Sequence, residues 1–259
     1  MSGRSLVEVA LRRERLLVAF GLLLVVVLAW AWLIAGAGML HDMDGALMPM
    51  SGGPWTPGHA LLVFAMWAVM MAAMMLPSAA PMILFYSAIA RRHGEPGATA
   101  GASSAIFGLG YLAVWTAFSL AATALQFALE RAALLSPMMQ TTSIALAGAL
   151  LVGAGLYQWS PLKRACLRHC RSPLAFVMTH WRPGAAGAFS MGARHGAYCL
   201  GCCWLLMALL FVGGIMNLGW IAGIAALVLL EKLAPAGHWI GRAAGALMVA
   251  WGLATLLAA

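Results

Sequence analysis

Three cysteines stand within five positions of the apolar stretch YCLGCCWLLM, residues 198–207. On a helix, Cys199, Cys203 and Met207 recur at every fourth residue. Cys202 lies one turn after Cys199, so all four side chains face one site. Thiolate and thioether sulfurs suit Cu(I), and a single helix cannot surround a metal ion with short bonds. We therefore predict a soft-metal site that a facing helix completes.

Methionines along a second apolar stretch are the candidate partners. The sequence HALLVFAMWAVMMAAMMLPSAAPM, residues 59–82, places them on one helical face and on the line beside it. The rise of a helix places Met82, the last methionine of this stretch, at a depth similar to that of Cys202, about 12–14 Å from the cytoplasmic boundary. Methionine also fills irregular gaps between packed helices, so packing is the alternative interpretation. The candidate ligands in this stretch are Met70, Met71, Met74, Met75 and Met82.

The same cysteines allow a redox interpretation. Cys199 and Cys202 have the Cys-x-x-Cys spacing of thiol–disulfide motifs, and Cys203 adds a third thiol. A membrane thiol–disulfide oxidoreductase would pass electrons through this cluster. Apolar surroundings disfavour a reactive thiolate unless a metal binds it, so the sequence favours metal binding. Packing of small residues in a helix is the third interpretation.

A second cysteine pair lies in the basic segment CLRHC, residues 166–170. If this segment is helical, Cys166, His169 and Cys170 share one face and suit the capture of a metal ion from the cytosol. Ordinary loop composition is the alternative.

Further ligand types gather in HDMDGALMPM, residues 41–50. The candidate ligands here are His41, Asp42 and Met43, which together suit copper in either oxidation state. A solvated loop is the alternative. The sequence shows no phosphate loop, nucleophile triad or paired-carboxylate site, so it favours a metal-handling protein over an enzyme.

These side chains belong to a membrane protein. Of the 259 residues, 64% are hydrophobic and only 8% are charged, far from the composition of a soluble domain. We predict an all-α fold, a polytopic transmembrane helix bundle of about seven spans in a single domain over residues 1–259. A turn at Met216–Asn217 is expected, because one helix over residues 196–233 would be about 57 Å long. The predicted spans are Leu16–Ile34, His59–Ala90, Gly101–Leu129, Met138–Trp159, Gly196–Met216, Leu218–Ala234 and Trp239–Leu257.

Basic residues gather on one side of these spans and set the expected orientation. The positive-inside rule places the N-terminus and the basic loop 160–195 in the cytoplasm, and loop 36–58 in the periplasm, of a bacterial inner membrane. This asymmetry accounts for the net charge of +8, so nucleic acid is not an expected partner. The first span is expected to be an uncleaved anchor, because its apolar run exceeds the core of about 7–15 residues in a signal peptide.

Several residues are expected at the membrane boundary. Glu231 and Lys232 follow one another at the end of the short sixth span and are predicted to form an interfacial pair. His195 lies near the cytoplasmic boundary, where amphipathic side chains snorkel toward water. The stretch Pro173–Trp181 is too short to cross and is predicted to lie at the interface.

Two blocks of the sequence resemble a known family. MWAVMMAAMMLPSAAPM at 66–82, and YCLGCCWLLMALLFVGGIMNLGW at 198–220 followed by EK at 231–232, are similar to bacterial metal-binding integral membrane proteins of otherwise unknown function. The resemblance implies a multispan membrane protein with a metal site, and it implies no activity.

The leading expectation is an inner-membrane protein that binds and transfers or transports a soft transition metal for cuproprotein supply. Copper as Cu(I) is the expected metal, with zinc second. The expected partners are membrane lipid, the metal ion, and a periplasmic or cytosolic metallochaperone or cuproprotein. The alternatives are the thiol–disulfide oxidoreductase and a non-metal scaffold subunit of a membrane complex. Because thiolate holds Cu(I) more tightly than thioether, we expect uptake or retention rather than export.

Overall fold

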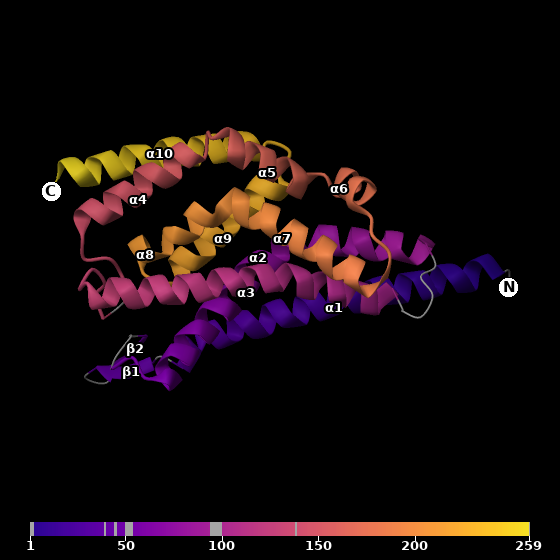
Figure 1. The fold of residues 1–259 in the computed structure, drawn as a ribbon, viewed down its shortest axis with the longest axis horizontal. Helices are drawn as coiled ribbons and strands as arrows, with labels where there is room; N and C mark the ends of the chain where they lie inside the picture. Colours follow the sequence, from indigo (N-terminus) through magenta and orange to yellow (C-terminus); the bar gives the residue numbers. More distant parts are fainter. Residues whose placement is uncertain are drawn as a thin grey trace.

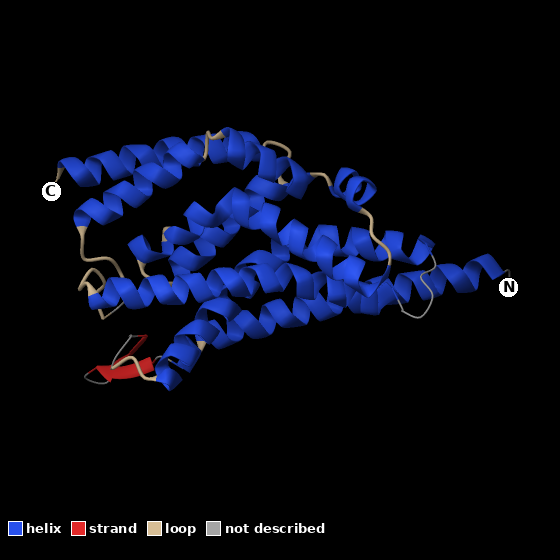
Figure 2. Cartoon of the chain, viewed as in Figure 1, coloured by secondary structure: helices blue, strands red, loops and turns tan. Residues whose placement is uncertain are grey.

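The computed structural model describes the backbone of residues 3–38, 40–43, 46–49, 54–93, 100–137 and 139–258, and the side chains of residues 16–38, 54–91, 101–137 and 139–258. The regular structure in this part of the chain is helical apart from one short hairpin, which confirms the predicted all-α fold (Figure 2). The helices are α1 Gly3–Ile34, α2 Pro57–His93, α3 Ala100–Arg131, α4 Ile144–Tyr157, α5 Pro161–Arg171, α6 Pro173–His180, α7 Gly184–Ala208, α8 Leu210–Gly213, α9 Leu218–Leu233 and α10 Gly237–Leu257, with a 3₁₀ turn, η1, at Gly36–Gly38.

The hairpin lies in the segment that the sequence analysis assigned to an outer loop. Strands β1 (Leu40–Met43) and β2 (Ala46–Pro49) are antiparallel, with His41 opposite Met48. The candidate ligands His41, Asp42 and Met43 therefore lie on β1, but their side chains are outside the described residues.

The helices that could cross a membrane number five among the described residues, where the sequence predicted about seven. A sixth is counted if α4 and α5, which meet at an angle of 62°, form one broken span. The predicted sixth span forms as α9, but its 16 residues fall short of the roughly 20 that a straight crossing needs. The five are Leu16–Ile34, Pro57–Arg91, Gly101–Arg131, Gly184–Gly213 and Gly237–Leu257.

The expected turn between the fifth and sixth predicted spans is present. Helix α8 ends at Gly213, and Gly214 has a φ of 94°, a conformation that suits glycine. The Asn217 side chain then accepts a hydrogen bond from the Trp220 amide and caps α9. Residues 196–233 therefore do not form one continuous helix.

The helices form two outer groups with α7 and α9 between them (Figure 1). Helices α1, α2 and α3 run along one side, and the pair α4 and α10 runs along the other. Glycines set the closest approaches. A Cβ on Gly110 of α3 would collide with the Phe189 carbonyl of α7, and one on Gly192 would collide with the Phe107 carbonyl. These contacts fix α7, the cysteine-bearing helix, directly against α3.

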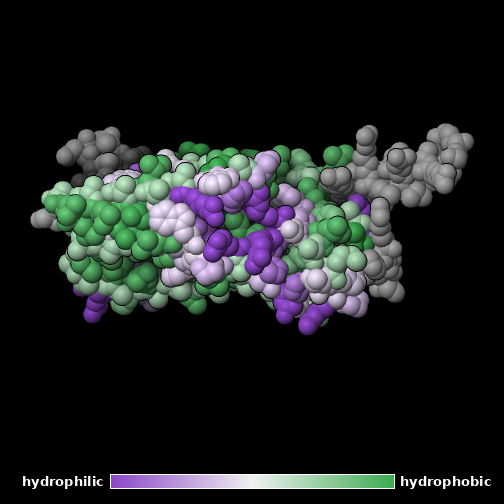
Figure 3. Space-filling view, turned by 90° about the horizontal axis from the view of Figure 1, so that it is seen from above, coloured by the Kyte–Doolittle hydropathy of each residue, from purple (hydrophilic) through white to green (hydrophobic). Residues whose placement is uncertain are grey.

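The pair α4 and α10 is held in the same way. A Cβ on Gly245 would lie 2.9 Å from the Gly155 carbonyl oxygen and 2.7 Å from Cβ of Gln158. The Gly241–Gly245 motif is thus a close-packing surface, as GxxxG spacing allows in membrane helices. Viewed onto the side formed by α4, α5 and α10, hydrophilic side chains gather in the middle, with apolar surface on either side (Figure 3). The exposed Arg164 and Arg168 of amphipathic α5 contribute to the polar surface.

Candidate metal centre

The cysteines of α7 are free thiols in the interior of the protein. Cys199, Cys202 and Cys203 are each at most 1% exposed, and Met207 is fully buried. Helix α2 continues through Pro77 and Pro81, and its candidate ligands Met70, Met71, Met74, Met75 and Met82 are all buried as well. Burial alone fits packing as well as metal binding, so the contacts of the sulfur atoms decide between the two.

Cys199 lies against a buried lysine that the sequence analysis placed at the interface. Lys232 Nζ of α9 donates to Cys199 Sγ at 2.9 Å and to the Ser78 hydroxyl at 3.0 Å. The Tyr111 hydroxyl of α3 is 3.0 Å from the same sulfur. Side chains of two helices, α9 and α3, therefore contact one thiol of a third, and α2 joins them through Ser78. The thiolate is the form of cysteine that binds metals, and a thiolate at Cys199 would have an ammonium beside it.

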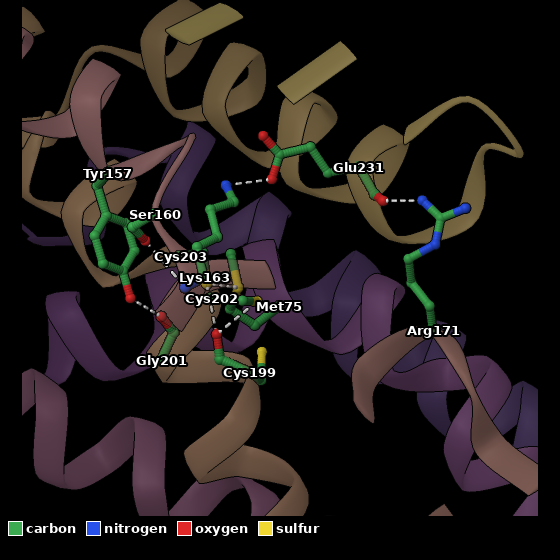
Figure 4. Close-up of polar contacts among 10 residues, drawn as sticks. All are labelled: Met75, Tyr157, Ser160, Lys163, Arg171, Cys199, Gly201, Cys202, Cys203 and Glu231. Atoms are coloured by element: carbon green, nitrogen blue, oxygen red, sulfur yellow. Dashed lines mark hydrogen bonds and ion pairs between the residues drawn. The ribbon is translucent and has the colours of Figure 1, made fainter. Parts of the chain in front are cut away.

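The Cys203 thiol faces the methionine helix. Its Sγ is 4.0 Å from Met75 Sδ, and it donates to the Cys199 carbonyl at 3.0 Å, as the Cys202 thiol also does (Figure 4). A metal that binds two sulfurs through bonds of about 2.3 Å, the zinc–thiolate length, requires them to lie within about 4.6 Å of each other. The pair Cys203 and Met75 meets that condition without movement of either helix.

Met75 is held in place through its own backbone. The Ser78 hydroxyl donates to the Met75 carbonyl at 2.9 Å, and the Tyr111 hydroxyl donates to the same oxygen at 3.2 Å. Thus the groups around Cys199 also fix the residue that faces Cys203. The sequence predicted that α2 and the cysteine helix meet at the level of Met82. The structure instead pairs Cys203 with Met75, about two turns away along α2.

Cys202 turns toward α5, which carries the second cysteine motif. The Cys170 thiol of α5 is its neighbour. Cys166 Sγ would lie 2.7 Å from a Cβ on Gly201, and His169 stacks on Tyr198 with ring centroids 4.1 Å apart. The segment is helical, so Cys166, His169 and Cys170 share one face, and that face packs against α7. The segment was expected to capture a metal ion from the cytosol. In the structure it lies beside the thiols of α7, and the cysteines of the two helices together form the thiol cluster: Cys166, Cys170, Cys199, Cys202 and Cys203.

The predicted interfacial pair of Glu231 and Lys232 is wrong. Both are buried, and because neighbouring residues on a helix point about 100° apart, they face different partners. Glu231 forms an ion pair with Lys163 of α5 at 2.6 Å (Figure 4). Arg171 donates to the Glu231 carbonyl at 2.7 Å and to the Ala234 carbonyl at 2.7 Å. These contacts fix the end of α9, and with it Lys232, against α5.

His195 is also misplaced by the sequence analysis, which expected it to reach toward water. Its side chain is 2% exposed and its ring lies among aromatic rings. It stacks on Tyr111 with centroids 5.7 Å apart and lies 5.4 Å from Phe176 of α6. His195 thus packs behind the tyrosine that contacts Cys199.

Within the part of the chain that the structure describes, no three His, Cys, Asp or Glu side chains form a group that could hold a metal ion. Cys203 and Met75 instead bring a thiol and a thioether into contact. Sequence reasoning missed Lys232, Tyr111 and Ser78 as neighbours of the cysteines. One signal was available, because a lysine in an apolar helix generally marks a functional site.

The fold and the site define a protein with several helices able to span a membrane, and with a buried cluster of soft sulfur ligands. Residues 64–255 match the model of the PpoB2 family, described as a copper chaperone, and the chain belongs to this family. The match begins in α2 and extends through α10, so it includes every contact described at the thiol cluster. No curated protein and no solved structure matches the chain.

Proposed function

We propose that this protein binds Cu(I) within the bacterial inner membrane and passes it to a cuproprotein. The observation that carries the proposal is the contact between Cys203 Sγ of α7 and Met75 Sδ of α2. Cys199, one turn before Cys203 and beside Lys232, supplies the second thiolate. Two thiolates and a thioether are soft ligands that favour Cu(I) over hard divalent ions. Copper is here the cargo of the protein.

Metal binding at this site would change the hydrogen bonding of Cys203. The Cys203 thiol now donates to the Cys199 carbonyl, and that hydrogen bond would be exchanged for a metal–sulfur bond. The proton of each binding thiol leaves to the solvent. The nearby carboxylate of Glu231 does not compete, because Lys163 already pairs with it.

The thiols of α5 provide a route toward the cytoplasm. Cys170 neighbours Cys202, which is adjacent in sequence to Cys203, so Cu(I) can pass along them by ligand exchange. We place α5 on the cytoplasmic side because of its basic residues. His41, Asp42 and Met43 on β1 are the proposed periplasmic station.

Copper binding is tested with purified protein in detergent under anaerobic conditions. We expect about one Cu(I) per chain at this centre, with affinity measured by competition against a chromophoric chelator. Cys203→Ala and Met75→Leu should each weaken binding about tenfold or more. Met82→Leu is the matched control, because it makes the same change elsewhere on α2 and conserves volume. Wild-type protein that binds no Cu(I), or equal affinities for Met75→Leu and Met82→Leu, would overturn the assignment.

The direction of transfer is tested in cells. We propose uptake or retention, because the thiolates hold Cu(I) more tightly than the thioethers do. Deleting the gene should therefore lower the copper content of a cuproenzyme at limiting copper and leave tolerance of excess copper nearly unchanged. Hypersensitivity to copper with raised cytosolic metal would instead show export.

A thiol–disulfide oxidoreductase is the second candidate, and the proximity of Cys170 and Cys202 favours it. A disulfide between Cys170 and Cys202 would join α5 to α7, whereas a disulfide between Cys199 and Cys202 would lie within α7. Alkylation of cells before and after an oxidant pulse separates the two functions. A Cys170–Cys202 disulfide that forms and disappears with growth conditions supports redox cycling, whereas thiols that stay reduced support metal transfer.

A further inference from the structure

Lys232 places a positive charge at the centre of the thiol cluster. Its side chain is buried, and its Nζ contacts Cys199 Sγ at 2.9 Å and the Ser78 hydroxyl at 3.0 Å. A charge removed from water needs a partner of opposite sign. Serine is neutral, and the neighbouring Glu231 is already paired with Lys163 at 2.6 Å. The sulfur ligands are therefore left to balance the charge of Lys232.

The directions of the side chains limit how many thiolates can do so. Cys199 and Cys203 lie one turn apart on the same helix, and Cys203 faces the neutral sulfur of Met75. Cys202 donates to the Cys199 carbonyl at 3.0 Å and has the Cys170 thiol of α5, not Met75, as its sulfur neighbour on another helix. The arrangement thus favours a metal complex with two thiolates and one thioether.

We propose that Lys232 makes this centre selective for the charge of the metal ion: it favours a soft monovalent cation over a soft divalent one. This inference rests on the proposed function. Two thiolates around a monovalent ion carry one negative charge, which Lys232 neutralises. Two thiolates around a divalent ion are neutral, so the charge of Lys232 remains uncompensated in apolar surroundings, where it is costly. Each thiol that binds releases its proton to the solvent in both cases.

The wild-type protein tests this without any substitution. Ag⁺ and Cd²⁺ are both soft and thiophilic, and they differ in charge, so each is titrated against Cu(I)-loaded protein under anaerobic conditions. We expect Ag⁺ to displace Cu(I) at similar concentrations and Cd²⁺ to fail at about 100-fold excess. Displacement of Cu(I) by Cd²⁺ as readily as by Ag⁺ would overturn the inference and leave Cu(I) binding intact. Protein that binds neither Cu(I) nor Ag⁺ refutes the proposed function itself.

Substitution of the lysine assigns the selectivity to its charge. Lys232→Met should lower Cu(I) affinity about 10-fold to 100-fold and should not lower Cd²⁺ affinity, whereas Lys232→Arg should keep the wild-type preference. Arg164→Met removes an exposed positive charge of α5 and is the control, with no change expected in either affinity. Equal losses of both metals in Lys232→Met would show a structural role instead. If neither lysine variant folds, the comparison of Ag⁺ with Cd²⁺ still decides.

Discussion

At the scale of single residues, each thiol of α7 is distinguished by what surrounds it. Cys199 meets a cation and a phenol, Cys203 meets a thioether, and Cys202 meets another thiol. Their spacing predicts that all three face one site, and the structure shows that all three are buried. The differences arise from residues far away along the chain. Lys232, for example, reaches Cys199 across 33 positions, and helical periodicity carries no information about such contacts.

The contact between Cys166 and Gly201 gives a prediction at this scale. A Cβ at position 201 would lie 2.7 Å from Cys166 Sγ, so Gly201→Ala should lower the free energy of unfolding by roughly 1–3 kcal/mol. In a Cys166→Ala background the same change should become neutral or stabilise by up to about 1 kcal/mol, as alanine does in helices. Thermal unfolding in detergent measures both. Additive effects would show that α5 does not cover α7 at this point.

At the scale of elements, the close approach of α3 and α7 depends on glycine. Gly110→Ala should destabilise the protein by about 1–3 kcal/mol, because its Cβ would collide with the backbone of α7. Gly108→Ala, two residues away on the same helix, has no atom within 4 Å of the added Cβ and should be neutral or mildly stabilising. Unfolding temperatures of the two variants check the difference. Similar losses in both would mean that α7 does not pack against this face of α3.

The ends of elements were harder to predict than their existence. The turn before α9 follows from chain length and is confirmed. Helix α7, however, begins at Gly184 rather than at the predicted Gly196, because the stretch of small residues before it packs on α3. Helix α4 begins at Ile144, where the Ser143 side chain caps it, and not at Met138. Hydropathy locates apolar cores and is insensitive to both effects.

At the scale of the whole molecule, the N- and C-termini lie at opposite ends of its longest axis (Figure 1). An odd number of crossings places them on opposite sides of a membrane. Five crossings and seven both meet this condition, whereas six do not, and we predict seven, with bent α4–α5 and short α9 among them, and a cytoplasmic N-terminus. An alkaline phosphatase fusion after the C-terminus should be active, and one after Arg171 should be inactive. The reverse pattern would invert the orientation.

The candidate site was predictable in its chemistry and not in its layout. Sulfur-rich stretches are visible in the sequence, and the pairing of the cysteine helix with α2 follows from their expected depth. The partner of Cys203 is Met75 rather than Met82, and helical rise from the expected boundary does not predict this. The burial of Lys232 and His195 depends on α5 and α6 covering α7, a tertiary arrangement that hydropathy does not contain.

The groups at Cys199 come from α2, α3, α7 and α9, and Lys232 is the last of them to be synthesised. During translation, the cysteines of α7 therefore leave the ribosome before their counter-charge does. A nascent chain halted after α7 would contain every sulfur ligand and lack the lysine. Because α9 and α10 follow directly, and Arg171 attaches the end of α9 to α5, insertion of the last two helices completes the site. We therefore expect the proposed copper centre to be complete only once α9 has been inserted and Lys232 has joined the sulfur ligands.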